Sequence, residues 1–143
     1  NRILGETNQI INLKIKSAIK KKLKVIFCIG ETLKEKKNSK TNLILKSQII
    51  NGLKKIKKNH NIIFAYEPVW SIGTGLIPKI EEILKIHDFI KNDIFKNSDL
   101  KIVYGGSVKA ENYKGIIDEK LVDGLLVGGA SINLDEFNQI IKF

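Results

Sequence analysis

A glutamate at the end of an apolar stretch is the first candidate for chemistry in this sequence. Glu67 follows the apolar residues 62–66 and precedes Pro68. In parallel α/β folds the reactive residues gather where the strands end, so this carboxylate would stand at the rim of a partly dry pocket. A carboxylate shielded from water accepts protons readily, which suits a general base. A glutamate taken alone could equally pair with a lysine or cap the following turn.

The loop after Glu67 has the composition of a hinged lid. Residues 68–77 combine the rigid Pro68, the large Trp70 and the flexible Gly73 and Gly75. Proline restricts the backbone at one end, while glycine adopts conformations that other residues avoid. This loop favours the interpretation of Glu67 as a general base in an active site that a lid closes.

Three glycine-bearing turns, at residues 72–75, 104–108 and 127–131, follow successive apolar stretches. Backbone N–H groups in such turns can point together at an anion, most simply a phosphate. Each turn alone is more often a tight turn than a ligand site, but three on one rim favour a phosphate site. Neither the Gly-Lys-Ser/Thr pattern nor the G-x-G-x-x-G fingerprint occurs, which disfavours a nucleotide.

The remaining reactive side chains give no second site. His60 precedes an apolar stretch at the end away from the reactive rim, and His87 lies in a helical pattern, so both are interpreted as surface or packing residues. Cys28 lies in the apolar run 25–29 and is interpreted as a small core residue. No cluster has the spacing of metal ligands, and no Ser or Cys has an evident His partner. Metal and covalent catalysis therefore lack support in the sequence.

The elements that must position these residues alternate between helices and strands. Helical spacing of apolar residues is found at about 10–19, 43–56, 80–95, 111–117 and 134–141, and continuous apolar runs predict strands at 25–29, 62–66, 102–104 and 124–127. This alternation predicts an α/β fold with a parallel sheet covered on its faces. Four such units could form a small doubly wound sheet or half of a barrel, and the pattern does not choose between them.

The composition is that of a basic globular chain. The 143 residues are 43% apolar and carry a formal net charge of +10. Almost all of the positive charge is lysine, Arg2 being the only arginine, and it is spread over helical segments, so no nucleic-acid partner is expected. No apolar run reaches the roughly 18 residues that span a bilayer, and the start lacks a signal pattern, so we expect a cytoplasmic protein without a membrane partner. The sequence contains no methionine and opens on Asn1, which predicts that its natural start is missing.

The motifs described above resemble the second half of the triosephosphate isomerase family. The resemblance rests on Ala65-Tyr66-Glu67-Pro68-Val69-Trp70 and Ile72-Gly73-Thr74-Gly75, with residues 28–31, 104–108 and 127–131 in family order and spacing. It implies a TIM (β/α)8 barrel, of which this chain supplies about the last four β/α units as the carboxyl-terminal part of a single domain, residues 1–143. It also implies a homodimer that interconverts dihydroxyacetone phosphate and D-glyceraldehyde 3-phosphate in glycolysis and gluconeogenesis, without cofactor or metal.

The resemblance implies a role for each matching residue. Glu67 would be the base that moves a proton between adjacent carbons through an enediolate. Backbone N–H groups would hold the substrate phosphate at Gly73, Ser107, Gly128 and Gly129. The lid and its supports would be Pro68, Val69, Trp70 and Thr74, with Tyr104 and Ser107 bracing the closed lid and Glu31 supporting the hinge near Trp70. Lid closure, for which this family is itself a standard example, would exclude water and protect the enediolate.

Two departures from the family pattern shape the expectations. The family's electrophilic histidine, and its substrate-contacting asparagine and lysine, belong upstream of this chain, so the 143 residues alone are expected to be inactive. The stretch 75–78 is shorter than the far hinge of the lid in many members. One alternative is another phosphate-binding β/α-barrel enzyme, which would have no reason to carry the Glu67-to-Trp70 motif. A basic nucleic-acid-binding module would need clustered arginine and aromatic residues, which the sequence lacks.

Overall fold

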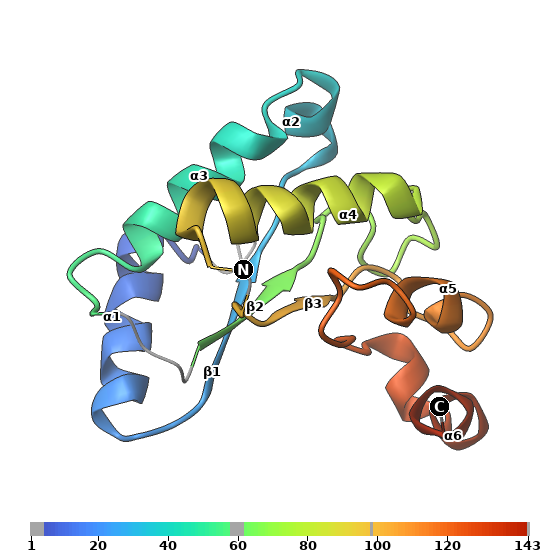
Figure 1. The fold of residues 1–143 in the computed structure, drawn as a ribbon. Coiled ribbons are helices and arrows are strands. Elements are labelled where there is room, and N and C mark those ends of the chain that lie inside the picture. The colour runs from blue at the N-terminus through green and yellow to red at the C-terminus, as the bar shows by residue number, and fades with distance from the viewer. Residues whose placement is uncertain (1–4, 58–61, 98, 143) are drawn as a thin grey trace.

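The computed structural model describes residues 5–57, 62–97 and 99–142 and contains one parallel sheet. Its strands lie in the order β1-β2-β3 (Figure 1) and are β1 (Val25–Ile29), β2 (Ile62–Tyr66) and β3 (Ile102–Tyr104). Val25 lies opposite Ile62, and Phe64 lies opposite Ile102. Because parallel strands share one direction, their carboxyl ends meet at the same edge of the sheet. The predicted α/β organisation is confirmed.

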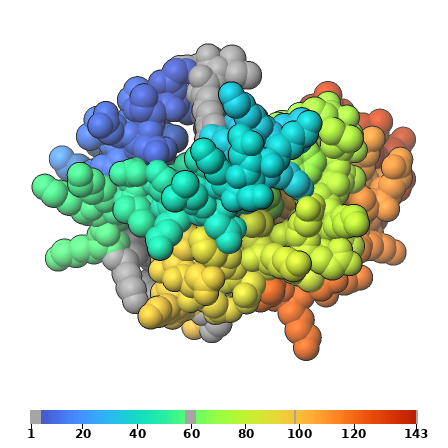
Figure 2. Space-filling model, turned by 90° about the horizontal axis from the view of Figure 1, so that it is seen from above, coloured from blue at the N-terminus to red at the C-terminus, as the bar shows by residue number. Residues whose placement is uncertain are grey.

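Helices connect the strands and flank the sheet. They are α1 (Asn8–Lys20), α2 (Leu33–Lys37), α3 (Thr41–Gly52), α4 (Ile80–Asp88), the π-helix η2 (Phe89–Phe95) that continues α4, α5 (Tyr113–Ile117), the 3-10 helix η3 (Gly129–Ile132) and α6 (Leu134–Ile141). Helices α1 and α3 pack against each other and against β1, and α3 also contacts η2. Figure 2 shows α2, α3, α4 and η2 lying side by side on one face of the molecule. No helix among the described residues is long and apolar enough to cross a membrane.

The two faces of the sheet differ in burial. Phe27 and Ile29 of β1 are buried, whereas Ile26, which points to the opposite face, is 51% exposed. On the covered face the rings of Phe27 and Phe64 lie 5.8 Å apart between centroids, and those of Phe64 and Phe95 lie 5.0 Å apart. The second face is covered only in part, because Ala65 is buried there while Ile26 is exposed.

The structure shifts several predicted boundaries. The helix predicted at 43–56 ends at Gly52, which packs so tightly on Phe27 that an added Cβ would lie 2.4 Å from the ring. The segment predicted as a strand at 124–127 runs parallel to β3 and forms a single bridge, between Leu125 and Tyr104, with backbone hydrogen bonds on both sides of it. The expectations placed on Asn1, Arg2 and His60 lie outside the described residues.

A buried ion pair joins η2 to the segment after β3. Lys91 Nζ lies 2.8 Å from Asp123 Oδ2, and these side chains are 5% and 15% exposed. Asp123 also accepts hydrogen bonds from the Ile102 N–H at 2.9 Å and from Lys101 Nζ at 3.0 Å. Burial alone would raise the pKa of Asp123, but these donors hold it below its usual value. The carboxylate is thus the centre of a small ionic network.

His87 is buried between α4 and the same segment. Its Nδ1 lies 2.9 Å from the carbonyl oxygen of Leu121, and because a carbonyl oxygen only accepts, Nδ1 carries the proton. Its Nε2 has no hydrogen-bond partner among the described residues. Burial lowers the pKa of His87 to about 4. His87 is therefore a neutral packing residue. The sequence had left open whether it was a surface residue or a packing residue.

Candidate active site

Contacts from both neighbouring strands fix the position of Glu67 directly after β2. Its N–H donates to the carbonyl of Ile29 at the end of β1, at 2.8 Å. On the other side, a Cβ added at Gly105 would lie 2.7 Å from Glu67 Cγ and 2.9 Å from Oε1. Real Cβ atoms do not approach so closely, so only glycine leaves room for the carboxylate at this place.

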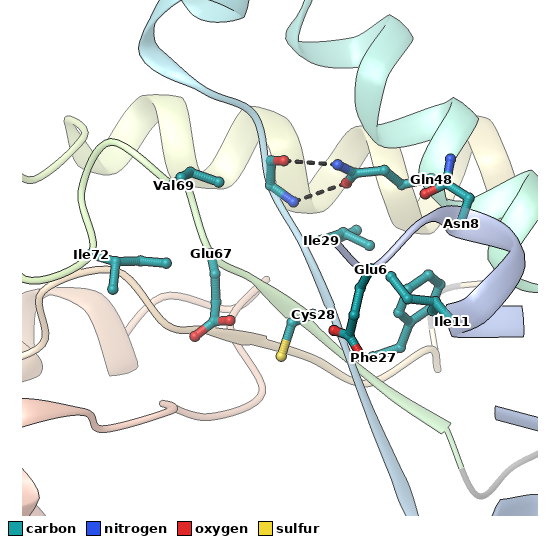
Figure 3. Close-up of a pocket in the computed structure, with 11 residues that line it drawn as sticks. Glu6, Asn8, Ile11, Phe27, Cys28, Ile29, Gln48, Glu67, Val69 and Ile72 are labelled. Atoms are coloured by element: carbon teal, nitrogen blue, oxygen red, sulfur yellow. Dashed lines mark hydrogen bonds between the residues drawn. The ribbon is translucent and has the colours of Figure 1, made fainter. Parts of the chain in front are cut away.

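Cys28 faces Glu67 across the end of the sheet, and both side chains point into the same pocket in Figure 3. Burial, followed by the negative charge of Glu67, raises the pKa of Cys28 to about 12. The thiol therefore keeps its proton at neutral pH. Cys28, interpreted from the sequence as a small core residue, is half-buried in this structure and lines this pocket of about 380 Å³.

A second cavity, of about 580 Å³, is also lined by Glu67 and brings the predicted glycine turns together. Its lining includes Gly73, Thr74, Ser107, Gly128 and Gly129. Among the described residues, the backbone N–H groups of Gly73, Ser107 and Gly128 donate to no other protein atom. Ser107 has a positive φ of 46°, a conformation that is costly outside glycine and often found at functional sites. Residues whose N–H groups make no hydrogen bond within the described part of the chain thus line the same cavity as the Glu67 carboxylate.

Glu31, Tyr66 and Trp70 form a hydrogen-bonded group at the start of the lid. Trp70 Nε1 donates to Glu31 Oε1 at 2.9 Å, and the Tyr66 hydroxyl lies 3.3 Å from both carboxylate oxygens. The Val69 N–H donates to the Glu31 carbonyl at 2.9 Å. Burial, followed by the charge of Glu31, raises the pKa of Tyr66, so its hydroxyl remains a donor. The start of the predicted lid is therefore fastened to Glu31, just after β1.

Ser71 is fully buried and connects the lid to the loop after β3. Its Oγ donates to the Leu76 carbonyl and lies 3.5 Å from the Tyr104 hydroxyl. Its carbonyl accepts from Ser107 Oγ and, at 3.2 Å, from Thr74 Oγ1. Burial raises the pKa of Tyr104 to about 12, so this hydroxyl also keeps its proton. Two turns of the predicted phosphate site are thus joined through one serine.

The structure places the predicted site residues in two groups. Around the 580 Å³ cavity lie Glu67, Gly73, Thr74, Ser107, Gly128 and Gly129. Outside its lining lie Glu31, Pro68, Val69, Trp70 and Tyr104, of which Val69 lines the 380 Å³ pocket. Within the described residues, no group of three or more His, Cys, Asp or Glu side chains could hold a metal ion. The roles of these residues stay predictions.

Sequence reasoning missed three polar side chains that contact these groups. They are Ser71, Lys36 and Gln48. Lys36 Nζ lies 4.2 Å from the centroid of the Trp70 ring and 2.9 Å from Glu82, whose pKa this hydrogen bond lowers. A polar residue inside an apolar pattern was an available signal for Ser71 and Gln48. Lys36 gave no signal, because it is one lysine among many.

The comparison with known proteins decides the family. The family model described as Triosephosphate isomerase matches residues 1–143. The chain belongs to the triosephosphate isomerase family. The triosephosphate isomerase of Thermodesulfovibrio yellowstonii is 47% identical over 143 residues, which cover 96% of this chain and 58% of that protein. The relative from Geobacter metallireducens is 44% identical, with 97% and 59% covered, and that from Geotalea uraniireducens is 42% identical, with 99% and 60% covered.

Membership of the triosephosphate isomerase family also gives the architecture. The parallel strands and their helices are part of a TIM barrel, as predicted, and the chain spans less than two thirds of the length of these curated relatives. This decides between the small doubly wound sheet and the partial barrel. In a closed barrel the uncovered face of β1, with Ile26 and Cys28, points to the interior.

Proposed function

We propose that the whole protein is a triosephosphate isomerase that interconverts dihydroxyacetone phosphate and D-glyceraldehyde 3-phosphate, with Glu67 as the base. The observation that carries this proposal is the cavity that Glu67 shares with Gly73, Ser107 and Gly128, whose N–H groups make no hydrogen bond with the described residues. A triose phosphate carries its reacting carbons and its phosphate on one short chain. It therefore needs a proton acceptor and an anion site in one cavity.

The chemistry proposed for this cavity is proton transfer. The Glu67 carboxylate takes a proton from one carbon and returns it to the adjacent carbon, through an enediolate. The N–H groups of Gly73, Ser107, Gly128 and Gly129 hold the phosphate, and the fixed backbone dipoles need no reorganisation when charge develops. The lid excludes water, which strengthens these interactions and protects the enediolate.

By its resemblance to the family, the chain is proposed to be the carboxyl-terminal part of one TIM-barrel domain, residues 1–143, in a homodimer of the cytoplasm. The resemblance also supports a reaction without cofactor or metal. By the same resemblance, the family's electrophilic histidine, with its asparagine and lysine, belongs to a segment upstream of these 143 residues. We therefore propose that these 143 residues supply the base and the phosphate site, and have no appreciable activity alone.

The test is a hybrid enzyme in which this chain replaces the matching segment of the Thermodesulfovibrio yellowstonii relative, which is 47% identical. We expect the hybrid to interconvert the two triose phosphates and the chain alone to be silent. Glu67→Gln in the hybrid should lower kcat at least about a hundredfold, because it removes the base. Glu111→Gln, at an exposed position, is the matched control. Undiminished turnover in a folded Glu67→Gln hybrid would contradict the proposal.

A further inference from the structure

Gln48 of α3 holds the backbone of Gly30 with both ends of its side-chain amide. The Gly30 N–H donates to Gln48 Oε1 at 3.0 Å, and Gln48 Nε2 donates to the Gly30 carbonyl at 2.9 Å, as the dashed lines in Figure 3 show. An amide side chain carries a donor and an acceptor side by side, so it can pair with the main chain as a neighbouring strand would. Two bonds from one planar group fix both the position and the orientation of Gly30.

Gly30 in turn is packed against the peptide of Glu67. A Cβ added at Gly30 would lie 1.8 Å from the Glu67 carbonyl oxygen and 2.6 Å from the carbonyl carbon. The Glu67 N–H donates to the Ile29 carbonyl, and the Val69 N–H donates to the Glu31 carbonyl, so β1 holds this segment on both sides of Gly30. A displacement of Gly30 must therefore displace the backbone that carries the base.

We infer that Gln48 is a positioning residue for the Glu67 base, acting through the Gly30 peptide. Gln48 lines the 380 Å³ pocket and not the 580 Å³ cavity proposed for the substrate, so its effect on turnover passes through Glu67. This inference rests on the proposed function of Glu67. A side chain that only fastened α3 to β1 would change stability and leave the turnover of the folded enzyme unaltered.

The first variant is Gln48→Met in the hybrid enzyme, which keeps the side-chain length and removes both hydrogen bonds. We expect kcat to fall about tenfold with KM changed less than about twofold, because a small displacement of a catalytic group affects the transition state more than binding. Gln139→Met, the same substitution at an exposed position of α6, should leave both constants unchanged. An unchanged kcat in a folded Gln48→Met hybrid would overturn the inference.

The second variant, Gln48→Glu, gives a pH-dependent readout. A protonated carboxyl presents a donor and an acceptor as the amide does, whereas an ionised one places a negative oxygen against the Gly30 carbonyl. The kcat of this variant relative to the parent should therefore rise as the pH falls. A relative kcat that does not change with pH would overturn the inference, because the state of the residue 48 side chain would then have no effect on turnover.

A readout that needs no turnover separates this inference from the proposed function. We expect the 13C chemical shift of the Glu67 side-chain carboxyl to change in the Gln48→Met hybrid and to stay constant in Gln139→Met. If the hybrid is folded but inactive, the proposed function fails, while a changed shift still supports positioning. If Glu67→Gln abolishes activity but Gln48→Met alters neither kcat nor the shift, the inference about Gln48 fails alone.

Discussion

Trp70 Nε1 donates a 2.9 Å hydrogen bond to the carboxylate of Glu31, which joins the first residues of the lid to the end of β1. Glu31 is only 1% exposed, so its carboxylate depends on protein donors, and Tyr66 is the second donor to it. A buried carboxylate without its donors is costly. The hinge can therefore leave Glu31 only if another donor takes the place of the indole.

The Trp70–Glu31 bond predicts the effect of Glu31→Gln. The substitution turns a charged acceptor into a neutral one, so we expect the free energy of unfolding to fall by about 1 kcal/mol. The loosened indole should also emit at longer wavelength, and Trp70 is the only tryptophan of the chain. Urea unfolding and emission spectra would measure both effects in the hybrid enzyme, after any tryptophan of the grafted segment is replaced by phenylalanine. Unchanged stability and emission, equal to those of Glu111→Gln, would refute the prediction.

The contact between Gly105 and the Glu67 side chain predicts that Gly105→Ala damages turnover. The added Cβ would lie 2.7 Å from Glu67 Cγ, so the carboxylate must move, and we expect kcat to fall about a hundredfold. Gly115→Ala is the matched control, because the nearest atom to its Cβ, in Ile80, lies at 3.5 Å. Steady-state kinetics of both hybrids would decide. Equal kcat values for the two would show that Glu67 tolerates the displacement.

The ionic network around Asp123 predicts an order of stabilities. Asp123→Ala leaves the buried ammonium of Lys91 without its partner, and we expect a loss of about 3–5 kcal/mol in the free energy of unfolding. Lys91→Met should cost less, because Asp123 keeps Lys101 and the Ile102 N–H as donors. Urea unfolding of the two hybrid variants gives the order. A larger loss in Lys91→Met would mean that the lysine contributes mainly through other contacts.

The sequence predicted the strands and the long helices because the pattern of apolar residues within each segment determines its secondary structure. Continuous apolar runs gave the bounds of β1, β2 and β3, and helical spacing gave α6. The short helix α2 was missed, although Thr32 and Glu35 form a capping box that marks a helix start. The segment predicted as a strand at 124–127 forms only one bridge, between Leu125 and Tyr104.

The contacts within the site could not be predicted in the same way. A motif gives the type of a residue, as for Glu67, but the approach of Gly105 and the two-point contact of Gln48 with Gly30 join segments far apart in the chain. Such contacts depend on how α3 and β3 pack against the rest of the fold. Only the folded structure brings these residues together.

His87 predicts how stability depends on pH. Its pKa is about 4 in the folded state, against 6.5 for a histidine exposed to water, because burial disfavours the charged ring. Between pH 6.5 and 4 the unfolded chain therefore binds a proton that the folded chain does not, so stability falls as the pH falls through this window. Each unit of pKa corresponds to about 1.4 kcal/mol, which gives a total loss of about 3 kcal/mol.

The variant His87→Gln isolates this dependence. Glutamine can still donate to the Leu121 carbonyl, but it does not titrate, so the part of the slope that comes from His87 should vanish. Urea unfolding of the parent and variant hybrids at pH 7, 6, 5 and 4 would give the difference curve. We expect the variant to gain stability relative to the parent as the pH falls below about 6.5, and no further below about 4. Parallel curves would show that the folded state accommodates the protonated ring.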